Sequence, residues 1–404
     1  MERTLLHGIR VADFTWAWAG PYGTMLLALM GAEVIKIESS SRLDHTRVRS
    51  LAAGPGFVGP DHAWIFNELN LNKLSINLDL SQPKAVELAK KLVKVCDVAV
   101  QNFRAGVMDR LGLGYSSLKE VKPDIIMLSS SAVGGTGPER QYVGFAPTFS
   151  ALGGLAYLTG FPDGPPIPVM GSADLRSATT AVFAILAAIY HRAVTGEGQH
   201  IDMSSRETIT ALIGESILEY AMNQRSPSRQ GNRDEAMAPH NCYPCRGENK
   251  WVSIAVDTEE EWQALCQVMG NPHWAEEERF SDAYARWHNQ EELDRLIAEW
   301  TIDYTHYEVM ERLQKVNVAA VPSFRGDELF NDPHLKERGF SEVVEHPLMG
   351  KRTVVGPPWK LSSTPARVSR HSPLLGEHNH YVFGELLGLS EEEVERLVEE
   401  KVIY

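Results

Sequence analysis

The 404-residue chain is poor in cysteine, in long apolar runs and in positive charge. Its four cysteines, Cys96, Cys242, Cys245 and Cys266, are too few for a disulfide scaffold and fit a reducing compartment. The longest apolar run, residues 177–190, is shorter than the ~20 residues that a bilayer span needs and is predicted to be a buried helix. With 39 Lys and Arg against 53 Asp and Glu, the net charge of −14 argues against a general nucleic-acid or polybasic membrane-surface protein.

Location and class follow from the same composition. The opening residues, Met1 to His7, contain no apolar stretch of signal-peptide length, so we expect a cytoplasmic protein. Apolar residues at 43% and charged residues at 23% are ordinary globular usage, which argues against a disordered, collagen-like or coiled-coil chain.

The pattern along the chain predicts an α/β fold with a second, smaller domain. From residue 8 to about 205, short β-branched runs alternate with helical patterns, which is typical of β-α-β units and a mostly parallel sheet. Residues 223–233 are polar, punctuated by Pro and Gly, and without periodicity. We therefore expect a large domain over 1–224, a small α+β domain over 225–325, and a C-terminal segment, 326–404, that returns to the large domain.

The first β-α-β unit does not fit a dinucleotide site. A strand over 9–14 and a strand over 32–37 flank a helix that opens at Gly20-Pro21. A Rossmann fingerprint needs Gly-x-Gly-x-x-Gly at this turn, whereas Trp16 and Trp18 stand there. The two indoles would obstruct a pyrophosphate, which argues against NAD or FAD.

A metal site is not expected either. The Cys-x-x-Cys motif of Cys242 and Cys245 follows His240, but no second ligand pair lies at the usual distance for structural zinc. Ordinary loop cysteines are the favoured interpretation, with metal or redox function as the alternative.

Asp174 is the most informative carboxylate, and two interpretations are open. It stands just before a predicted helix that runs to about residue 194, so it can cap that helix by accepting a backbone N–H bond. Alternatively, the helix N-terminus keeps the carboxylate ionised, and an ionised Asp at a helix mouth can act as a nucleophile.

Short motifs recur in a fixed order along almost the whole chain. They occupy residues 8–15, 19–21, 31–38, 72–79, 101–112, 195–199, 374–379 and 385–388. Each motif alone is weak, but their order and spacing together closely resemble the class III CoA-transferase family of the CaiB/BaiF type.

The resemblance implies transfer of CoA between carboxylic acids, with Asp174 as the nucleophile that forms an aspartyl-CoA thioester. CoA thioesters are then substrates, and no permanently bound cofactor is expected. The family fold is a Rossmann-like large domain built from both chain ends plus a small domain, with two chains interlocked as a dimer. The partner is either a second copy or a related subunit.

The family pattern also carries site residues onto this chain. For CoA binding they are Trp18, Ala19, Leu78, Asp79, Leu80, Ser81, Asn102, Phe103, Arg104, Arg110, Val143, Gly144, Phe145 and Ala146. The substrate pocket is expected to contain Trp16, Trp18, Gly134 and Gly135, and the glycine loop that ends at Gly137 is a hypothetical source of oxyanion donors. Guanidinium suits phosphate, so Arg104 and Arg110 are expected at the CoA phosphates, with surface salt bridges as the alternative.

Two departures from the family bear on specificity. Ser39 stands where many members carry an Arg. The contacts to the adenine or the phosphates of CoA at this position must therefore differ or come from Arg42. Trp16 and Trp18 stand where formyl-CoA:oxalate-type members carry His and Gln. Indoles bury apolar groups and solvate small dianions poorly, so we expect a bulky, aryl- or alkyl-substituted acceptor such as benzylsuccinate, with a donor such as succinyl-CoA.

Two other functions remain as alternatives. The α-methylacyl-CoA racemase branch needs an acid/base His in a stretch that aligns with residues 144–146, where this chain has Phe145. A catalytically silent scaffold subunit is the second alternative, and the presence of Asp174 argues against it.

Overall fold

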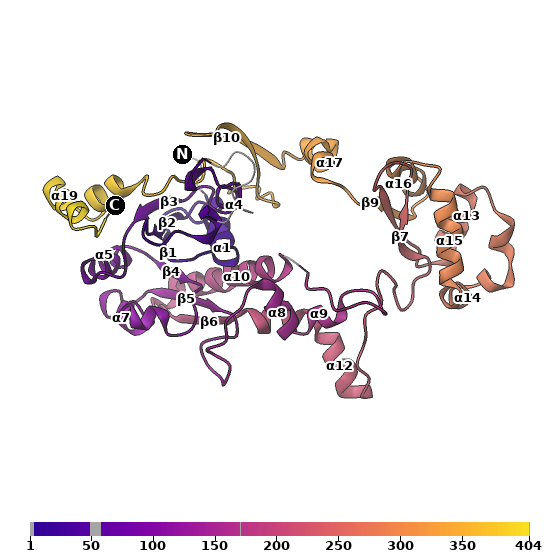
Figure 1. Ribbon diagram of the computed structural model, residues 1–404, viewed down its shortest axis with the longest axis horizontal. Coiled ribbons are helices and arrows are strands. Elements are labelled where there is room, and N and C mark those ends of the chain that lie inside the picture. Colours follow the sequence, from indigo (N-terminus) through magenta and orange to yellow (C-terminus); the bar gives the residue numbers. More distant parts are fainter. Residues whose placement is uncertain (1–3, 49–57, 170, 404) are drawn as a thin grey trace. The chain divides into compact units, whose positions relative to one another are not determined.

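The computed structural model describes residues 4–48, 58–169 and 171–403, which fall into two compact units (Figure 1). The large unit comprises Met1–Ala156, Pro168–Ser226 and His334–Tyr404, and the small unit comprises Tyr157–Ile167 and Pro227–Pro333. Both chain ends therefore belong to the large unit. Residues 157–167, which we expected in the large domain, group with the small unit, because they pack against its 229–231 segment.

A six-stranded parallel sheet forms the centre of the large unit, as the alternating pattern predicted. Its strand order is β3-β2-β1-β4-β5-β6, the doubly wound order in which the chain reverses direction between β1 and β4. The strands are β1 (Arg10–Asp13), β2 (Glu33–Glu38), β3 (Leu74–Asn77), β4 (Val98–Gln101), β5 (Ile126–Ser131) and β6 (His200–Ser204).

Helices cover both faces of this sheet because alternate strand residues point to opposite sides. On one face α1 (Ala19–Leu29) and α10 (Ser172–Thr195) pack on Val11, Val98 and Leu128. The other face is covered by α5 (Pro83–Lys94), α7 (Tyr115–Val121), a π-helix (His380–Leu386) and α19 (Glu391–Glu399). Figure 1 shows the C-terminal segment in yellow beside the N-terminal strands, and the His378 N–H donates to the Ser75 carbonyl of β3, while the Lys84–Glu400 ion pair joins this segment to α5.

Shorter elements complete the large unit. A hairpin of β10 (Ser341–His346) and β11 (Gly350–Val355) contributes Val344 to the α1 side of the core. Its remaining helices are α2 (His45–Val48), α4 (Trp64–Leu69), α6 (Val107–Arg110), α8 (Ala146–Leu152), α11 (Ser205–Thr210) and α12 (Gly214–Asn223). Two short helices, α9 (Leu155–Leu158) and α18 (Pro333–Glu337), contain residues of both units.

The small unit is α+β, with an antiparallel sheet of order β7-β8-β9. Its strands are β7 (His240–Pro244), β8 (Trp251–Ala255) and β9 (Ala319–Pro322), and its helices are α13 (Glu259–Val268), α14 (Ala283–His288), α15 (Gln290–Thr301), α16 (His306–Gln314) and α17 (Gly326–Asn331). The core gathers apolar side chains around the buried Trp262. Thr258 and Glu261 form the capping box that the sequence predicted at the start of α13.

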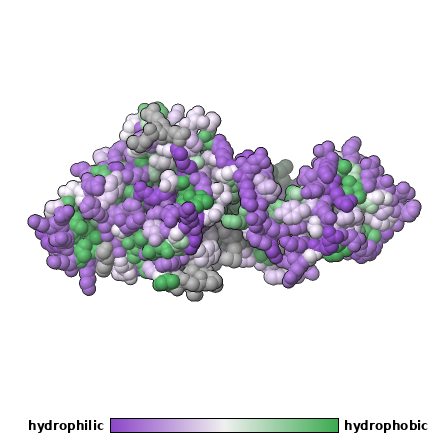
Figure 2. All heavy atoms as spheres, turned by 90° about the horizontal axis from the view of Figure 1, so that it is seen from above, coloured by the Kyte–Doolittle hydropathy of each residue, from purple (hydrophilic) through white to green (hydrophobic). Residues whose placement is uncertain are grey.

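The apolar run within α10 is buried on one face only. Ala178, Ala181 and Ile185 pack inward, whereas Phe183 and Tyr190 are each 74% exposed. The prediction of a buried helix was therefore wrong for half of the helix. Among the described residues, α10 is the one helix long and apolar enough by composition to cross a membrane. On the face drawn in Figure 2, hydrophilic residues predominate and hydrophobic ones form small groups among them.

Candidate active site

The candidate site lies at the carboxyl edge of the sheet, where β1 and β4 end side by side. In doubly wound sheets this reversal point opens a crevice for ligands. The segment after β1 leads into α1, and the segment after β4 begins with Asn102. Gly20 permits their close approach, because a Cβ at this position would lie 2.4 Å from Thr15 Cβ and 2.9 Å from Asn102 Cγ.

Asp174 is the third residue of α10 and does not cap it. The N-cap position is Gly171, and no side chain bonds to the free N–H groups there, so the capping interpretation was wrong. The carboxylate has no hydrogen bond or ion pair with any described residue. Burial raises the pKa of Asp174 to about 6, opposite in direction to the effect we expected from the helix N-terminus. At pH 7 the side chain is still ionised by about ten to one.

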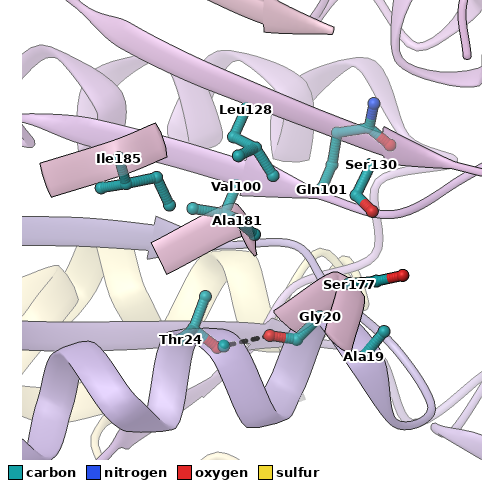
Figure 3. A pocket seen from close by; sticks show the side chains of 11 residues that line it. Ala19, Gly20, Thr24, Val100, Gln101, Leu128, Ser130, Ser177, Ala181 and Ile185 are labelled. Atoms are coloured by element: carbon teal, nitrogen blue, oxygen red, sulfur yellow. Dashed lines mark hydrogen bonds between the residues drawn. The ribbon is translucent and has the colours of Figure 1, made fainter. Parts of the chain in front are cut away.

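A small cavity lies between α1 and α10 (Figure 3). One of its lining residues, Ser177, follows Asp174 by three positions on α10. The cavity volume of about 10 Å³ is room for roughly one water molecule. Ala19, Gly20 and Ser177 lie together at one end of it (Figure 3). The Ser177 hydroxyl is buried and has no partner among the described residues, which makes it a polar group close to the nucleophile candidate.

Aromatic side chains gather around Trp16. Its ring meets His45 at 5.9 Å and Phe103 at 6.0 Å, both edge to face, and Phe145 lies 6.5 Å from His45. The Arg42 guanidinium lies over the indole, 5.1 Å from the ring centre. It places a cation three residues after Ser39, the position at which many family members carry an Arg. Trp16 thus meets Phe103 directly, and His45 connects Trp16 to Phe145, although these residues are far apart in the sequence.

The other expected CoA-binding residues differ in accessibility. Arg104 and Arg110 are exposed, and among the residues that the structure describes no carboxylate pairs with either. Trp18 is 36% exposed at the start of α1 and precedes Ala19. The interpretation of the two arginines as surface salt bridges therefore finds no support in the described part of the chain.

The stretch that follows β3 is tied to the C-terminus. Leu78 is buried in the core and pairs with Ile403, and the Asp79 N–H donates to the Val402 carbonyl. Leu80 is half-buried, and Ser81 donates its N–H to the Asp79 carboxylate. The Leu78 side chain is not available to a ligand, so any contribution from this position comes from its backbone.

The glycine loop offers fewer free donors than expected. Gly134 is in the left-handed region at φ 86°, and the Gly135 N–H already donates to the Asp202 carboxylate at 2.8 Å. The Gly135 N–H is therefore already used by Asp202 and is not free to bind an oxyanion in this arrangement. Farther along, Phe145 is the N-cap residue of α8, and the flanking positions are the exposed Val143, the half-buried Gly144 and the buried Ala146.

Sequence reasoning missed Asp44, His45 and Ser177. Asp44 has one local signal, an Asp two residues before Thr46, which is typical of a turn in which the carboxylate accepts a nearby N–H. Nothing in the local sequence links His45 or Ser177 to the site. All four cysteines are free thiols, and the described residues contain no cluster of three or more His, Cys, Asp or Glu that could hold a metal ion.

Comparisons with known proteins point to one family. Residues 6–379 match the family model of CoA-transferase family III. The chain is 35% identical over 399 residues, 98% of each chain, to a succinyl-CoA–D-citramalate CoA-transferase of Chloroflexus aurantiacus. It is also 35% identical to a succinyl-CoA:mesaconate CoA-transferase of Haloarcula hispanica, over 92% of this chain and 94% of that one.

A subunit of a larger enzyme and a solved structure are similar as well. The chain is 34% identical to the alpha subunit of a succinyl-CoA–L-malate CoA-transferase of Chloroflexus aurantiacus, over all of this chain and 93% of that one. The crystal structure of a CaiB/BaiF family protein from Brucella suis superimposes with a TM-score of 0.87 at 30% identity, over 95% of this chain and 100% of that one. The chain belongs to CoA-transferase family III and is a class III CoA-transferase.

Proposed function

We propose that this enzyme transfers CoA from succinyl-CoA to a dicarboxylic acid of four or five carbons, through a thioester on Asp174. The observation that carries the proposal is the Asp174 carboxylate itself, which is largely buried, without a partner among the described residues, and has a pKa raised to about 6. A desolvated carboxylate is a stronger nucleophile than a hydrated one, yet this one stays mostly ionised at neutral pH.

The proposed reaction conserves the thioester bond. An Asp174 oxygen attacks the acyl carbon and expels CoA thiolate, which leaves a mixed anhydride. The thiolate then attacks the Asp174 carbonyl carbon and releases the donor acid, so that an aspartyl-CoA thioester remains. The acceptor carboxylate repeats both steps in reverse, and the free Asp174 carboxylate is restored without net consumption of water or protons.

Similarity supports the choice of substrates. The relatives named above are described as succinyl-CoA transferases for D-citramalate, mesaconate and L-malate, all short dicarboxylic acids. In this chain the exposed Arg42 beside Trp16 is a suitable partner for a second carboxylate. The CoA phosphates are assigned in this proposal to Arg104 and Arg110.

A second class of acceptor, bulky aryl- or alkyl-substituted acids such as benzylsuccinate, is favoured by one observation. Trp16, His45, Phe103 and Phe145 form an aromatic group that could bury a phenyl ring. At ~25 cal/mol per Å² of apolar area, such burial would favour an aryl acid by a few kcal/mol. No relative named above carries such an acceptor in its name.

A CoA-exchange assay tests both classes. Purified enzyme with succinyl-CoA is offered citramalate, mesaconate, malate, benzylsuccinate and oxalate, and the new CoA thioesters are separated by mass. We expect the short dicarboxylates to react fastest, and we expect hydroxylamine to convert the Asp174 thioester into a side-chain hydroxamate with release of CoA. Full activity of Asp174→Ala, or label on another residue, would overturn the proposed mechanism. Faster turnover of benzylsuccinate would favour the aromatic acceptor. In that case, Trp16→Gln should reduce the ratio of benzylsuccinate turnover to turnover of the short dicarboxylates.

The racemase alternative is tested in the same preparation. Phe145 carries no group that can move a proton, so solvent deuterium should not enter the α-carbon of a 2-methylacyl-CoA at a rate competitive with CoA transfer. Rapid deuterium incorporation that is lost in Asp174→Asn would revive that alternative.

We further propose that the enzyme works in the cytoplasm as a dimer, either with a second copy or with a related subunit. The exposed face of α10 supports an interface, because Phe183, Tyr190 and Val194 are 74%, 74% and 69% exposed. The α12 side chains Ile217, Leu218 and Met222 are exposed as well. Mass measurement under native conditions distinguishes the states, and Phe183→Glu should shift the protein towards the monomer.

A further inference from the structure

The turn between β1 and α1, residues 15–17, is held by side chains from other parts of the sheet. The Lys36 ammonium donates to the Thr15 carbonyl at 2.8 Å. Asn102 bonds to both backbone polar groups of Trp16: its Oδ1 accepts the Trp16 N–H at 2.8 Å, and its Nδ2 donates to the Trp16 carbonyl at 2.7 Å. The oxygen and the nitrogen of the Asn102 amide thus each bond to the turn.

Ala17 is the point of the turn that most needs support. Its φ of 65° lies in the left-handed region, which is unfavourable for a residue with a Cβ. The Ala17 N–H donates to the two carboxylate oxygens of Asp44 at 3.2 and 3.3 Å. Asp44 therefore compensates the unfavourable backbone conformation at Ala17.

Asp44 connects this turn to two further groups. It is 2% exposed, and its Oδ2 lies 3.3 Å from the Lys36 ammonium. Its Oδ1 accepts the Thr46 N–H at 2.9 Å and the Thr46 hydroxyl at 2.8 Å, which fixes the first turn of α2. Burial alone would lower the pKa of Lys36, but Asp44 and the neighbouring carboxylates raise it, so the ammonium stays charged.

The residues on either side of Asp44 cover the indole of the same turn. Arg42 lies over the Trp16 ring, and His45 meets its edge. Asp44 thus bonds to the backbone of the turn, and the residues on either side of it pack on the Trp16 side chain of the same turn. Any movement of Asp44 would displace the backbone and the aromatic surroundings of Trp16 together.

We infer that Asp44 is a positioning residue for the acyl-CoA site, because it holds the 15–17 turn, the Trp16 indole and the start of α1 in place. This inference rests on the proposed function for the role of the site, but the effect on the turn is measurable without it. Asp44 itself has no part in the chemistry; it acts through the turn.

Glu38 is the matched control. Its carboxylate is as deeply buried as that of Asp44, pairs with Arg47 at 2.9 Å and accepts the Ser75 hydroxyl, but makes no bond to residues 15–17. A purely structural role for buried carboxylates predicts that Asp44→Ala and Glu38→Gln behave alike. A positioning role predicts that only the Asp44 variant changes the turn and the use of acyl-CoA.

The experiment compares Asp44→Ala, Asp44→Asn and Glu38→Gln in the full-length protein. Amide hydrogen exchange of peptides that contain residues 14–19 reports on the turn, and steady-state kinetics separate KM for succinyl-CoA from kcat. We expect Asp44→Ala to lose protection in these peptides and to raise KM about tenfold, with a smaller change in kcat. Asp44→Asn keeps an oxygen that accepts the Ala17 N–H, so it should retain most of the protection.

Opposite results would overturn the inference. They are unchanged exchange of residues 14–19 in Asp44→Ala, an equal rise of KM in Glu38→Gln, or an Asp44→Asn variant as impaired as Asp44→Ala. If Asp44→Ala does not fold, Asp44→Leu, which fills a similar volume but also lacks an oxygen to accept the Ala17 N–H, takes its place in the comparison with Glu38→Gln. If the wild type uses no acyl-CoA at all, the proposed function fails. The hydrogen-exchange data still test whether Asp44 stabilises the 15–17 turn.

Discussion

The large and the small unit differ in how deeply they bury both partners of an ion pair. In the large unit, three ion pairs, Lys36–Asp44, Arg47–Glu38 and Lys73–Asp13, have both side chains at most 1% exposed. In the small unit, the buried Arg286 pairs with Glu259, whose side chain is 48% exposed. Among the residues that the structure describes, no ion pair of the small unit buries both partners so fully.

This difference in the burial of ion pairs bears on the role of the buried pairs in the large unit. Removal of two charges from water offsets much of their attraction, so an apolar replacement of a whole pair is often neutral or stabilising. The small unit follows that rule with an apolar core around Trp262. Two of the three pairs of the large unit also bond to the backbone at the candidate site, because the Lys36 ammonium donates to the Thr15 carbonyl and the Lys73 ammonium donates to the Pro21 carbonyl. These two pairs therefore serve the geometry of the site, whereas the Arg47–Glu38 pair makes no bond to residues 15–17.

The largest expected effect concerns Asp174. Asp174→Asn removes the nucleophile, and we expect CoA exchange to fall by about four orders of magnitude or more. The same change should stabilise the fold at pH 7. The folded pKa of about 6 lies above the ordinary 3.8, so the folded state is penalised for ionisation once the pH rises through this window. After screening is allowed for, the gain is about 1–3 kcal/mol.

Urea denaturation of both proteins across pH 3.5–8 checks the sign. The variant should be more stable at pH 7 to 8, and the difference should shrink as the pH falls below 6 and become small at pH 3.5, where Asp174 is mostly protonated in both states. A variant that is less stable than the wild type at pH 7 would contradict the raised pKa. In the wild type, activity should fall on the acid side with a midpoint near 6.

The next effect compares the buried charges of the two units directly. Lys73→Met leaves Asp13 in a buried position without its closest ammonium, at 3.0 Å, and should lower the free energy of unfolding by about 3–5 kcal/mol. Glu259→Gln should lower it by at most about 1 kcal/mol, because Arg286 keeps its bonds to the Ala238 and Phe280 carbonyls. Equal losses in chemical denaturation would remove the distinction between the units.

Exposed arginines give a smaller, functional contrast. Arg110→Ala in the large unit should raise KM for succinyl-CoA by the equivalent of about 1–3 kcal/mol if a charged bond to phosphate is lost. Arg295→Ala on α15 of the small unit removes an exposed guanidinium that pairs with Glu292, and should leave KM unchanged. Steady-state kinetics at varied succinyl-CoA decide, and an unchanged KM in Arg110→Ala would place that residue outside the site.

Local patterns predicted much of the fold. The strands predicted over residues 9–14 and 32–37 contain β1 and β2, because short β-branched runs separated by a Gly-Pro helix start have few alternative folds. The same holds for α13, whose start follows from the Thr258–Glu261 pattern. Family membership was predicted from motif order and is confirmed by the match over residues 6–379.

Long-range features could not be predicted in this way. The contact of Asp44 with Ala17 and the stacking of Arg42 on Trp16 depend on where separate segments meet at the sheet edge. The half-exposed α10 was missed because composition does not distinguish a helix buried on both sides from one that presents an apolar face outward. The direction of the Asp174 pKa shift depends on the burial of the carboxyl group in the folded chain, which the local sequence does not give.

The smallest expected effects should be alike in the two units, because helix caps act locally. Thr258 in the small unit accepts the Glu261 N–H at 3.2 Å, and Ser390 in the large unit accepts the Glu393 N–H at 3.2 Å. Each glutamate bonds back to the N–H of its capping residue. Thr258→Ala and Ser390→Ala should therefore each lower the free energy of unfolding by about 1 kcal/mol and leave KM for succinyl-CoA unchanged. Thermal or urea denaturation measures the loss; a cap whose removal alters KM would show that capping at that position, like the buried ion pairs, reaches the site.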